Sequence, residues 1–269
     1  MSAANQQDEP RRALITGGAS GFGFETARAL LDQGAQVAIG DVDEGKLQSA
    51  ATALGKDRLL TLRLDVTSAS SAEAAIAACH KAFGGLDTLV NCAGILEFSK
   101  FVDTAEEAWD RTIDVDLKGT FLCSQKAAPL LCASGRGRIV NIGSDASKIG
   151  WPMVTAYVAA KFGVVGLTKS IAGELADDGV TVNCVCPVGC PTTGMGESIL
   201  DWKTRATGLS PEQVKAATAR DIPLGRNCSE ADVVNAILFF LQDSSAFITG
   251  TALDVDGGMT STAAVPGTG

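Results

Sequence analysis

The chain has 269 residues, of which 46% are hydrophobic and 20% are charged, and its formal net charge is −9. This length and balance suit one large α/β domain, or two small ones, with a sizeable buried core. No basic cluster offsets the negative charge, which argues against a surface for nucleic acid or anionic membranes. Residues 1–12 lack the apolar core of a signal peptide and no apolar run is long enough to span a bilayer, so we expect a cytoplasmic protein.

Short β-rich runs alternate with longer helical patterns along the whole chain. Strands are expected at Arg12–Thr16, Gln36–Gly40, Leu59–Leu64, Leu86–Val90, Arg138–Ile142, Val180–Val185 and Thr251–Val255. Helices are expected at Phe22–Gln33, Glu44–Leu54, Ser71–Phe83, Thr104–Leu131, Met153–Ala176 and Glu230–Leu241, the fourth opened by a capping box of Thr104 and Glu107. Because right-handed crossovers place helices on both faces of a parallel sheet, the pattern predicts an α/β, Rossmann-type, doubly wound sheet of about seven strands. Residues 1–269 are expected to form a single domain.

One long segment departs from this alternation. Residues 188–226 form an insertion after the sixth expected strand and are rich in glycine, proline and threonine. The segment contains one expected short helix, with Ser210 as its N-cap and Pro211 at its first position. Long insertions of this kind are usually lids or binding loops, so we expect it to cover a substrate.

A glycine-rich turn joins the first expected strand to the first expected helix. Gly17, Gly21 and Gly23 allow a tight turn and a close approach of the backbone to a pyrophosphate, and the helix N-terminus offers N–H groups to that anion. Such a turn could also be an ordinary connection, but its place between a strand and a helix favours dinucleotide binding. The contacts are expected from the run Gly17, Ser20, Gly21, Phe22 and Gly23.

Asp41 ends the second expected strand and predicts which dinucleotide is bound. A carboxylate there can accept hydrogen bonds from the adenosine ribose and would repel a 2′-phosphate. Positions 19 and 42 are Ala19 and Val42, so neither supplies a cation that would neutralise such a phosphate. The alternative is that Asp41 only caps the helix that follows. We expect NAD(H) and not NADP(H).

Histidine and cysteine usage limits other chemistries. The chain has eight cysteines and one histidine, His80, and its cysteines form no CxxC pair. We therefore expect reduced thiols and no metal site. A Ser/His/Asp hydrolase would have to use His80, which lies in the middle of an expected surface helix.

Taken with these residues, further motifs make the chain resemble the short-chain dehydrogenase/reductase family over nearly its whole length. The resemblance implies cofactor contacts from several motifs after the glycine turn. These are Asp65 with Val66, then Asn91, Ala93 and Gly94 of the sequence Asn91-Cys92-Ala93-Gly94, and later Pro187 and Thr192. It also implies a catalytic serine, Ser144, thirteen residues before a Tyr157-x-x-x-Lys161 motif.

Two residues depart from the family pattern. Asp116 stands where the family usually has an asparagine that holds a water in a proton relay beneath the lysine. Asp116 could take part in that relay, or it could only satisfy backbone groups of its helix. Val188 stands after Pro187 where the family usually has glycine, which could reshape the backbone beside the nicotinamide.

The spacing of Tyr157 and Lys161 predicts a general acid/base. Residues four apart on a helix share one face. A free phenol has a pKa near 10, and lowering it by about three units requires roughly 4 kcal/mol of differential stabilisation. The lysine ammonium and the positive nicotinamide of NAD⁺ both favour the phenolate. Tyr157 would then take the proton of an alcohol while Ser144 holds the substrate oxygen, and Lys161 would also bind the nicotinamide ribose.

The sequence thus predicts an NAD-dependent alcohol dehydrogenase/ketone reductase. Its alternatives are an NAD-binding redox sensor without catalysis and a reductase of keto-thioesters. The expected substrate is an apolar, cyclic or aromatic secondary alcohol, because the candidate pocket residues are Ile95, Leu96, Phe98, Trp151, Met153, Met195, Ile199 and Trp202. From the resemblance we also expect a homotetramer.

Overall fold

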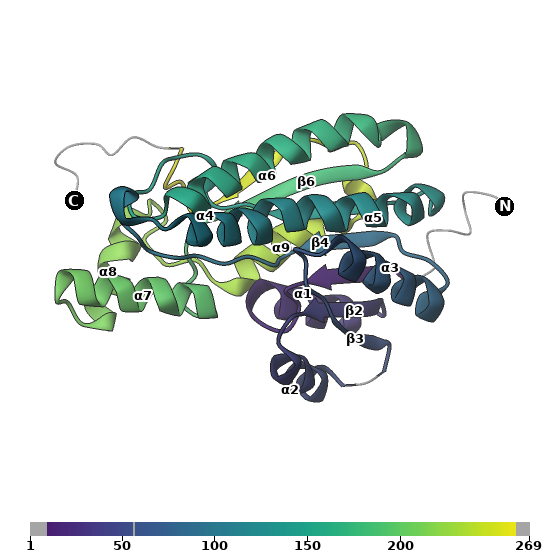
Figure 1. Ribbon diagram of the computed structural model, residues 1–269, viewed down its shortest axis with the longest axis horizontal. Helices are drawn as coiled ribbons and strands as arrows, with labels where there is room; N and C mark the ends of the chain where they lie inside the picture. Colours follow the sequence, from purple (N-terminus) through teal and green to yellow (C-terminus); the bar gives the residue numbers. More distant parts are fainter. Residues whose placement is uncertain (1–9, 56, 262–269) are drawn as a thin grey trace.

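The computed structural model describes residues 10–55 and 57–261. It has one parallel sheet of seven strands, in the order β3-β2-β1-β4-β5-β6-β7, with helices on both of its faces (Figure 1). The α/β Rossmann-type sheet predicted from the alternation of strands and helices is therefore confirmed. The strands are β1 Arg12–Thr16, β2 Gln36–Asp41, β3 Leu59–Arg63, β4 Thr88–Asn91, β5 Arg138–Ile142, β6 Thr181–Pro187 and β7 Ala252–Val255. Of the predicted single domain, residues 1–9, 56 and 262–269 lie outside the described residues.

Two apolar cores, one on each face, hold the helices to the sheet. On one face α1, α2 and α9 cover the strands, with Leu30 and Ile237 buried between them. On the other face α3, α5 and α6 bury Ile76, Leu131 and Ala172. Both faces of the central strands are thus removed from water, as a parallel sheet requires. The helices are α1 Gly21–Asp32, α2 Glu44–Leu54, α3 Ala69–Phe83, α4 Glu106–Ile113, α5 Gly119–Ala133, α6 Thr155–Glu174, α7 Gly194–Thr207, α8 Pro211–Asp221 and α9 Glu230–Leu241.

The prediction of a single helix over Thr104–Leu131 is wrong, although most of this stretch is helical. The structure divides this stretch into α4, a π-helical turn at Asp114–Lys118, and α5. The predicted capping box is also wrong, because the Thr104 hydroxyl donates to the carbonyl of Lys100 at 2.9 Å and Ala105 is the N-cap. The apolar periodicity continues through the π-helical turn, so it gave no sign of the break.

The insertion at residues 188–226 contains two helices where one was predicted. Ser210 begins α8 as expected, and its capping box pairs it with Gln213. The additional helix is α7, which starts with two glycines, Gly194 and Gly196, and glycine has a low helix propensity. Both helices lie together on one side of the molecule, beyond the ends of the strands (Figure 1). Among the described residues, no helix has both the length and the apolar composition that a membrane crossing demands.

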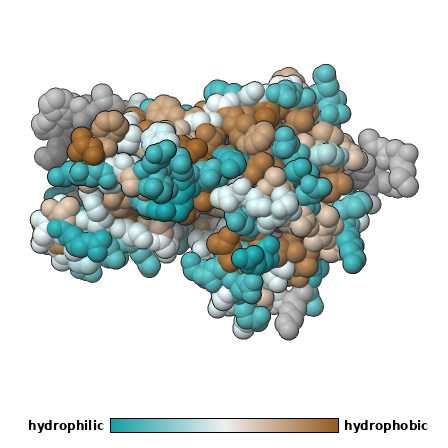
Figure 2. Space-filling model, viewed as in Figure 1, coloured by the Kyte–Doolittle hydropathy of each residue, from teal (hydrophilic) through white to brown (hydrophobic). Residues whose placement is uncertain are grey.

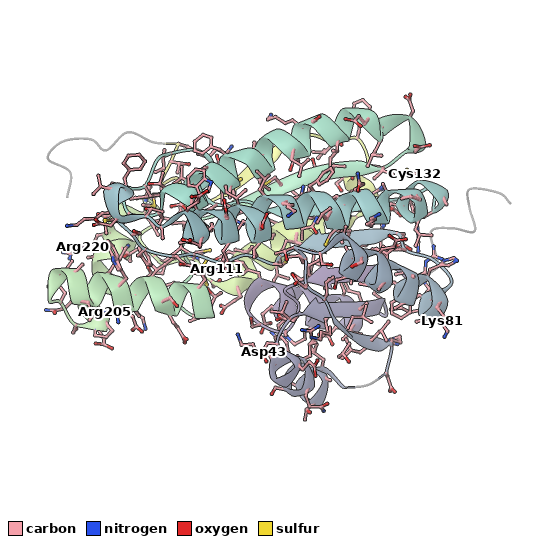
Figure 3. All side chains as sticks on the ribbon, in the orientation of Figure 1. Asp43, Lys81, Arg111, Cys132, Arg205 and Arg220 are labelled. Carbon is pink, nitrogen blue, oxygen red and sulfur yellow. The ribbon has the colours of Figure 1, made fainter. Side chains whose placement is uncertain are left out.

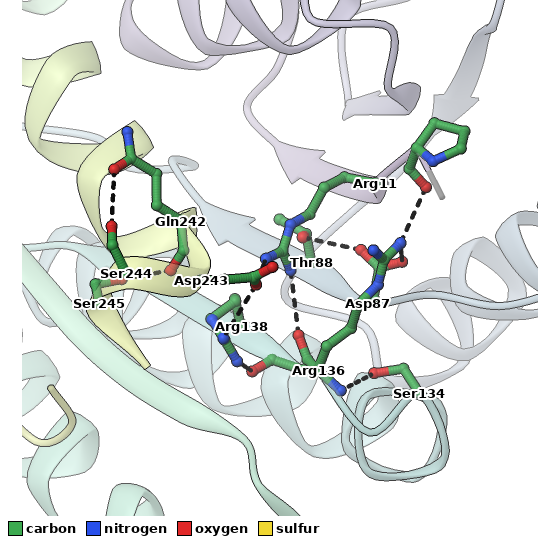
Figure 4. Close-up of polar contacts among 12 residues, drawn as sticks. Arg11, Asp87, Thr88, Ser134, Arg136, Arg138, Gln242, Asp243, Ser244 and Ser245 are labelled. Carbon is green, nitrogen blue, oxygen red and sulfur yellow. Dashed lines mark hydrogen bonds and ion pairs between the residues drawn. The ribbon is translucent and has the colours of Figure 1, made fainter. Parts of the chain in front are cut away.

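The amino ends of the strands are tied together by a charged network (Figure 4). Asp87 is fully buried, and its carboxylate pairs with Arg12 and Arg136, each at 3.1 Å. Asp243 pairs with Arg11 at 2.7 Å and with Arg138 at 3.5 Å. These pairs join β1, β4, β5 and the segment after α9. Charged side chains therefore fill the end of the sheet where the strands begin, and a site has to lie where the strands end.

Candidate active site

A cavity of about 750 Å³ lies at the carboxyl ends of the strands. Segments that follow all seven strands line it, together with residues of α6, α7 and α8. This is the edge at which open α/β sheets bind their ligands. The segments after the first six strands contribute residues within 17–23, 41–46, 64–66, 92–98, 142–146 and 187–196, and Met259 lines the cavity after β7.

The glycine turn forms one end of the cavity. Gly17 has a φ of +61°, and a Cβ on it would lie 2.8 Å from the amide nitrogen of Ala93, so only glycine fits between these two backbones. Helix α1 then begins at Gly21, and the side chain of its N-cap, Ser20, makes no capping hydrogen bond. The first N–H groups of α1 are therefore left for an anion in the cavity.

Asp41 and Asp65 line the same end of the cavity, at the ends of β2 and β3. The Asp41 carboxylate accepts a hydrogen bond from the amide of Asp43 at 3.1 Å, and no cation among the described residues forms an ion pair with it. Asp65 accepts from the amide and hydroxyl of Thr67 at 3.0 and 2.7 Å. Asp41 thus keeps acceptor capacity and an unpaired charge that faces the cavity.

Ser144, Tyr157 and Lys161 lie together in the middle of the cavity. Ser144 follows β5, and the other two lie on α6, where the spacing of four residues puts them on one face. The Lys161 Nζ atom lies 5.4 Å from the centroid of the Tyr157 ring and donates to the carbonyl of Ile142 at 3.0 Å. All three side chains are buried, so their charges act in a medium of low dielectric.

Asp116 lies beneath this group, in the π-helical turn between α4 and α5. Its side chain is fully buried. One carboxylate oxygen accepts from the amide of Ile95 at 2.8 Å, and the other lies 3.3 Å from Lys161 Nζ. The π-helical turn inserts an extra residue into the helix at this point, a feature often found at functional sites. Asp116 therefore both satisfies a backbone group and forms an ion pair with the lysine.

The buried charges shift one another's pKa values. Burial raises the pKa of Tyr157, the charge of Lys161 lowers it and the charge of Asp116 raises it, with a net upward shift. Burial acts to lower the pKa of Lys161, but the negative charges of Asp116 and Tyr157 outweigh it and the pKa is raised. Burial also raises the pKa of Asp116, against the opposing effect of Lys161. The lysine thus remains an ammonium at neutral pH.

Asp145, next to Ser144, is a residue that the sequence analysis missed. Its carboxylate accepts from the Ser144 hydroxyl at 2.7 Å, from the amide of Ala146 at 2.9 Å and from the indole N–H of Trp151 at 3.0 Å. Burial raises the pKa of the Asp145 carboxyl, and these three donors oppose that shift. A carboxylate directly after the expected serine was the available signal in the sequence.

The other end of the cavity is apolar and reaches under α7. The Phe98 and Trp202 rings stack with centroids 4.5 Å apart, joining the segment after β4 to α7. The Met195 sulfur lies 3.8 Å from the Tyr157 hydroxyl, so α7 covers the tyrosine. The segment after β4 is also fixed by Arg111, labelled in Figure 3, whose guanidinium donates to the Glu97 carboxylate at 2.8 and 2.9 Å.

Most residues predicted from the sequence line the cavity. Besides the glycine turn, Asp41 and Asp65, these are Val66, Ala93, Gly94, Ser144, Tyr157, Lys161 and Pro187, and Val188 lies there too. Of the eight candidate pocket residues, seven line the cavity, and the exception is Met153, whose carbonyl accepts from the amide of Ser99.

Two predicted cofactor contacts lie outside the cavity lining. Asn91 is buried in the sheet, where its amide donates to Asn141 and Ser124 at 2.8 and 3.1 Å. Thr192 is exposed, and its neighbour Thr193 lines the cavity as the N-cap of α7. The backbone turns after Pro191, and this turn could not be placed to within one residue from the sequence.

A buried tyrosine and lysine at the carboxyl edge of a seven-stranded parallel sheet, next to a glycine turn, define the class of Rossmann-fold oxidoreductases. A family model described as enoyl-(acyl carrier protein) reductase matches residues 17–260. The chain belongs to the short-chain dehydrogenase/reductase family and is an oxidoreductase of secondary alcohols and ketones.

Relatives cover nearly the whole chain. The chain is 41% identical to 2-(S)-hydroxypropyl-CoM dehydrogenase 3 of Xanthobacter autotrophicus, over 91% of this chain and 95% of that protein. It is 38% identical to trans-4-hydroxycyclohexanecarboxylate dehydrogenase of Sinomonas cyclohexanicum, over 97% and 96% of the two chains. Among solved structures, a single-residue variant of actinorhodin polyketide ketoreductase with NADPH superposes with a TM-score of 0.89 at 32% identity, covering 95% of this chain and 99% of that one.

Proposed function

We propose that the protein is an NAD(H)-dependent dehydrogenase of apolar secondary alcohols, with Tyr157 as its general acid/base. The observation that carries the proposal is that Ser144, Tyr157 and Lys161 line one cavity with the glycine turn. One cavity thus contains the proton acceptor Tyr157, the cation Lys161 that activates it and the N-terminus of α1, which can bind a phosphate. A substrate and a cofactor bound there together would contact all three.

The residues of the glycine-turn end fit a dinucleotide. A Cβ at Gly17 would close the approach between two backbones, and the open N-terminus of α1 suits a pyrophosphate. Asp41 would accept from the adenosine ribose hydroxyls, and its unpaired charge would repel the 2′-phosphate of NADP(H). Bound NAD⁺ supplies the acceptor for the hydride that leaves the alcohol carbon.

The chain's own residues handle the proton. In the oxidative direction, the Tyr157 phenolate takes the proton from the substrate hydroxyl, while the Ser144 hydroxyl, which donates to Asp145 in this structure, turns to donate to the substrate oxygen. Lys161, whose Nζ atom lies 5.4 Å from the centroid of the Tyr157 ring, stabilises the phenolate and is itself oriented by the carbonyl of Ile142. In the reductive direction Tyr157 returns the proton to the carbonyl oxygen. Burial excludes water, so the charge of Lys161 is only weakly screened.

Asp116 acts on this group through Lys161. Its carboxylate lies 3.3 Å from the ammonium and keeps that group charged. The same negative charge works against ionisation of Tyr157, which favours an alkaline optimum for alcohol oxidation. Whether Asp116 also passes a proton, alone or through a water, is decided by the pH profile of its asparagine variant.

The apolar end of the cavity supports a cyclic or aromatic substrate. The stacked Phe98 and Trp202 rings, with Leu96 and Ile199, offer a flat hydrophobic wall. A dehydrogenase named for a hydroxycyclohexanecarboxylate is 38% identical to this chain, which favours the same size of substrate. We further propose that the enzyme works in the cytoplasm as a homotetramer.

A keto-thioester reductase is the second candidate. A 3-oxoacyl-[acyl-carrier-protein] reductase of Staphylococcus aureus is 35% identical over 93% of this chain, which favours it. The unpaired carboxylate of Asp41 opposes it, because such reductases usually take NADPH.

Absorbance at 340 nm tests the proposal. The protein is assayed with NAD⁺ and with NADP⁺ over cyclic, aromatic and aliphatic secondary alcohols, and in reverse with the ketones and a keto-thioester. We expect NAD⁺-linked oxidation that Tyr157→Phe abolishes, because this variant loses the phenolic oxygen and keeps the ring. Full NAD⁺ binding without turnover of any alcohol or ketone would instead support a redox sensor.

A further inference from the structure

We propose that Asp145 selects substrates by charge. The site would accept secondary alcohols that are neutral or cationic beside the carbinol carbon, and would reject those with an anionic group there. The inference rests on the proposed function, in which Ser144 holds the substrate oxygen. It adds a specificity-determining residue and a substrate class to that function.

The position of Asp145 is fixed by three hydrogen bonds. One carboxylate oxygen accepts from the Ser144 hydroxyl and from the amide of Ala146, and the other accepts from the indole of Trp151. All three donors are neutral, and each favours the ionised carboxylate. The negative charge of Asp145 is therefore fixed in the cavity wall, and none of its three donors carries a positive charge that would neutralise it.

The described residues provide no ion-pair partner for Asp145, whereas the other charges near the reacting group are paired. Lys161 forms its ion pair with Asp116. The carboxylates of Asp41 and Asp65 lie at the glycine-turn end, around the expected dinucleotide. Asp145 is thus the uncompensated charge that a substituent on the carbinol carbon would meet.

The distance from Asp145 to the reacting centre is bounded by its contact with Ser144. The two side-chain oxygens lie 2.7 Å apart. If the substrate oxygen sits at hydrogen-bonding distance from the same hydroxyl, it lies no more than about 5.5 Å from the carboxylate. A carboxylate substituent on the carbinol carbon would then lie within about 8 Å of Asp145, a separation at which like charges in a partly buried site still repel.

Lys203, a cation that lines the substrate end, lies too far from the reacting group to pair with such an anion. Lys203 on α7 and Lys215 on α8 line the cavity. Met195 contacts Tyr157, and Lys203 comes eight residues later on the same helix, which is about 12 Å along the axis. These lysines could pair with an anionic group at the remote end of a long substrate. The site would therefore reject only those anionic groups that lie next to the carbinol carbon.

A matched set of alcohols tests the inference. The probes are 1-phenylethanol, mandelate, which has a carboxylate on the carbinol carbon, and 2-amino-1-phenylethanol, which has an ammonium on the adjacent carbon. We measure kcat/KM for each with NAD⁺, and Ki for the two charged probes against 1-phenylethanol. For the native enzyme we expect the neutral and cationic probes to exceed mandelate at least about tenfold in kcat/KM, a difference of about 1.4 kcal/mol, and mandelate to be the weaker inhibitor.

Three variants separate charge from shape. Asp145→Asn removes the charge with little change in volume, and we expect the discrimination of both other probes against mandelate to fall at least about tenfold. Trp151→Phe keeps the Asp145 charge and removes the indole donor, so the discrimination should persist even where KM rises for all three probes. Asp201→Asn removes a charge from an exposed position on α7 and should leave all ratios unchanged.

The outcomes distinguish failure of the role of Asp145 from failure of the proposed dehydrogenase function. If the native enzyme oxidises 1-phenylethanol and mandelate with equal kcat/KM, and mandelate inhibits as strongly as the ammonium probe, the role of Asp145 is overturned. The proposed dehydrogenase function then still stands. A discrimination that survives in Asp145→Asn overturns the role of Asp145 as well. A melting temperature and an NAD⁺ affinity like those of the native enzyme establish that the Asp145→Asn variant is folded. Failure of every neutral alcohol, ketone and keto-thioester in the wider screen counts against the proposed function itself.

Discussion

The Nζ atom of Lys161 lies 3.3 Å from a carboxylate oxygen of Asp116, and both side chains are buried. Removing either partner of a buried ion pair leaves an uncompensated charge, which costs several kcal/mol, so the pair is strongly coupled. The same lysine faces the ring of Tyr157 at 5.4 Å. A change at Asp116 therefore reaches the tyrosine through the lysine as well as directly.

We predict that Asp116→Asn lowers the pH optimum of alcohol oxidation. Oxidation requires the Tyr157 phenolate, so its rate rises with pH until the pH exceeds the pKa of the phenol. Burial and the charge of Asp116 both raise that pKa, and the substitution would remove the second contribution. We expect the apparent pKa in the pH profile of kcat/KM to fall by about one unit, equivalent to about 1.4 kcal/mol.

Two controls accompany this measurement. Tyr157→Phe should be inactive at every pH. Asp114→Asn removes an exposed carboxylate two residues away, one that pairs with Lys118 at 3.1 Å, and should leave the profile unchanged. If the Asp116→Asn enzyme keeps both the rate and the apparent pKa of the native enzyme, Asp116 has only the structural role of holding the amide of Ile95.

Cofactor choice should depend on Asp41. We expect kcat/KM with NAD⁺ to exceed that with NADP⁺ at least about tenfold, because an unpaired carboxylate facing a phosphate costs more than about 1.4 kcal/mol. Asp41→Ala combined with Val42→Arg should narrow the ratio, since the second change supplies a cation at an exposed position next to the cavity. Equal use of both cofactors by the native enzyme would contradict the role given to Asp41.

Gly17→Ala should weaken dinucleotide binding. The added Cβ would meet the amide nitrogen of Ala93 at 2.8 Å, and the φ of +61° is strained for alanine. We expect NADH affinity, measured by fluorescence titration, to fall at least about tenfold, a loss of about 1.4 kcal/mol. The matched control is Gly173→Ala on α6, where a Cβ meets no atom within 4 Å. That variant should bind NADH normally and should not lose stability.

The parts of the site that follow from local rules could be predicted from the sequence. Tyr157 and Lys161 share a face because helix geometry fixes residues four apart, and the glycine turn follows from its place between a strand and a helix. The parallel sheet needed only right-handed crossovers and short connections. These inferences rest on spacing along the chain, which the sequence displays directly.

The parts that depend on contacts between distant segments could not be predicted. The π-helical turn at Asp116 accompanies a bond to Ile95, which lies in another loop, while the local pattern still reads as one helix. Asp145 gains its significance from its bond to Trp151 and from the partial burial of its carboxylate in the cavity wall. Helix α7 is stabilised by its contacts with α8 and by the stacking of Trp202 on Phe98, which offset the low helix propensity of Gly194 and Gly196.

The final prediction concerns assembly. Several large apolar side chains remain exposed on the described surface, and two groups of them bear on assembly. One group includes Phe121 on α5 and Phe162 on α6, which are 40% and 46% exposed, and hydrophobic residues gather over this face in Figure 2. The other includes Phe239 on α9 and Phe247 before β7, the latter fully exposed. Two distinct apolar patches suit a tetramer with two kinds of two-fold interface.

A variant at either patch should therefore disrupt one interface of the tetramer and leave the other interface intact. Light scattering at micromolar concentration should give four chains for the native protein. Phe121→Glu should leave dimers joined through the Phe247 region, and Phe247→Glu should leave dimers joined through α5 and α6, because a buried unpaired charge disrupts an apolar interface. The double variant should be monomeric, and a change of the exposed Glu212 to Gln should leave the tetramer intact. A native protein that runs as a monomer, or single variants that both remain tetrameric, would refute this assembly.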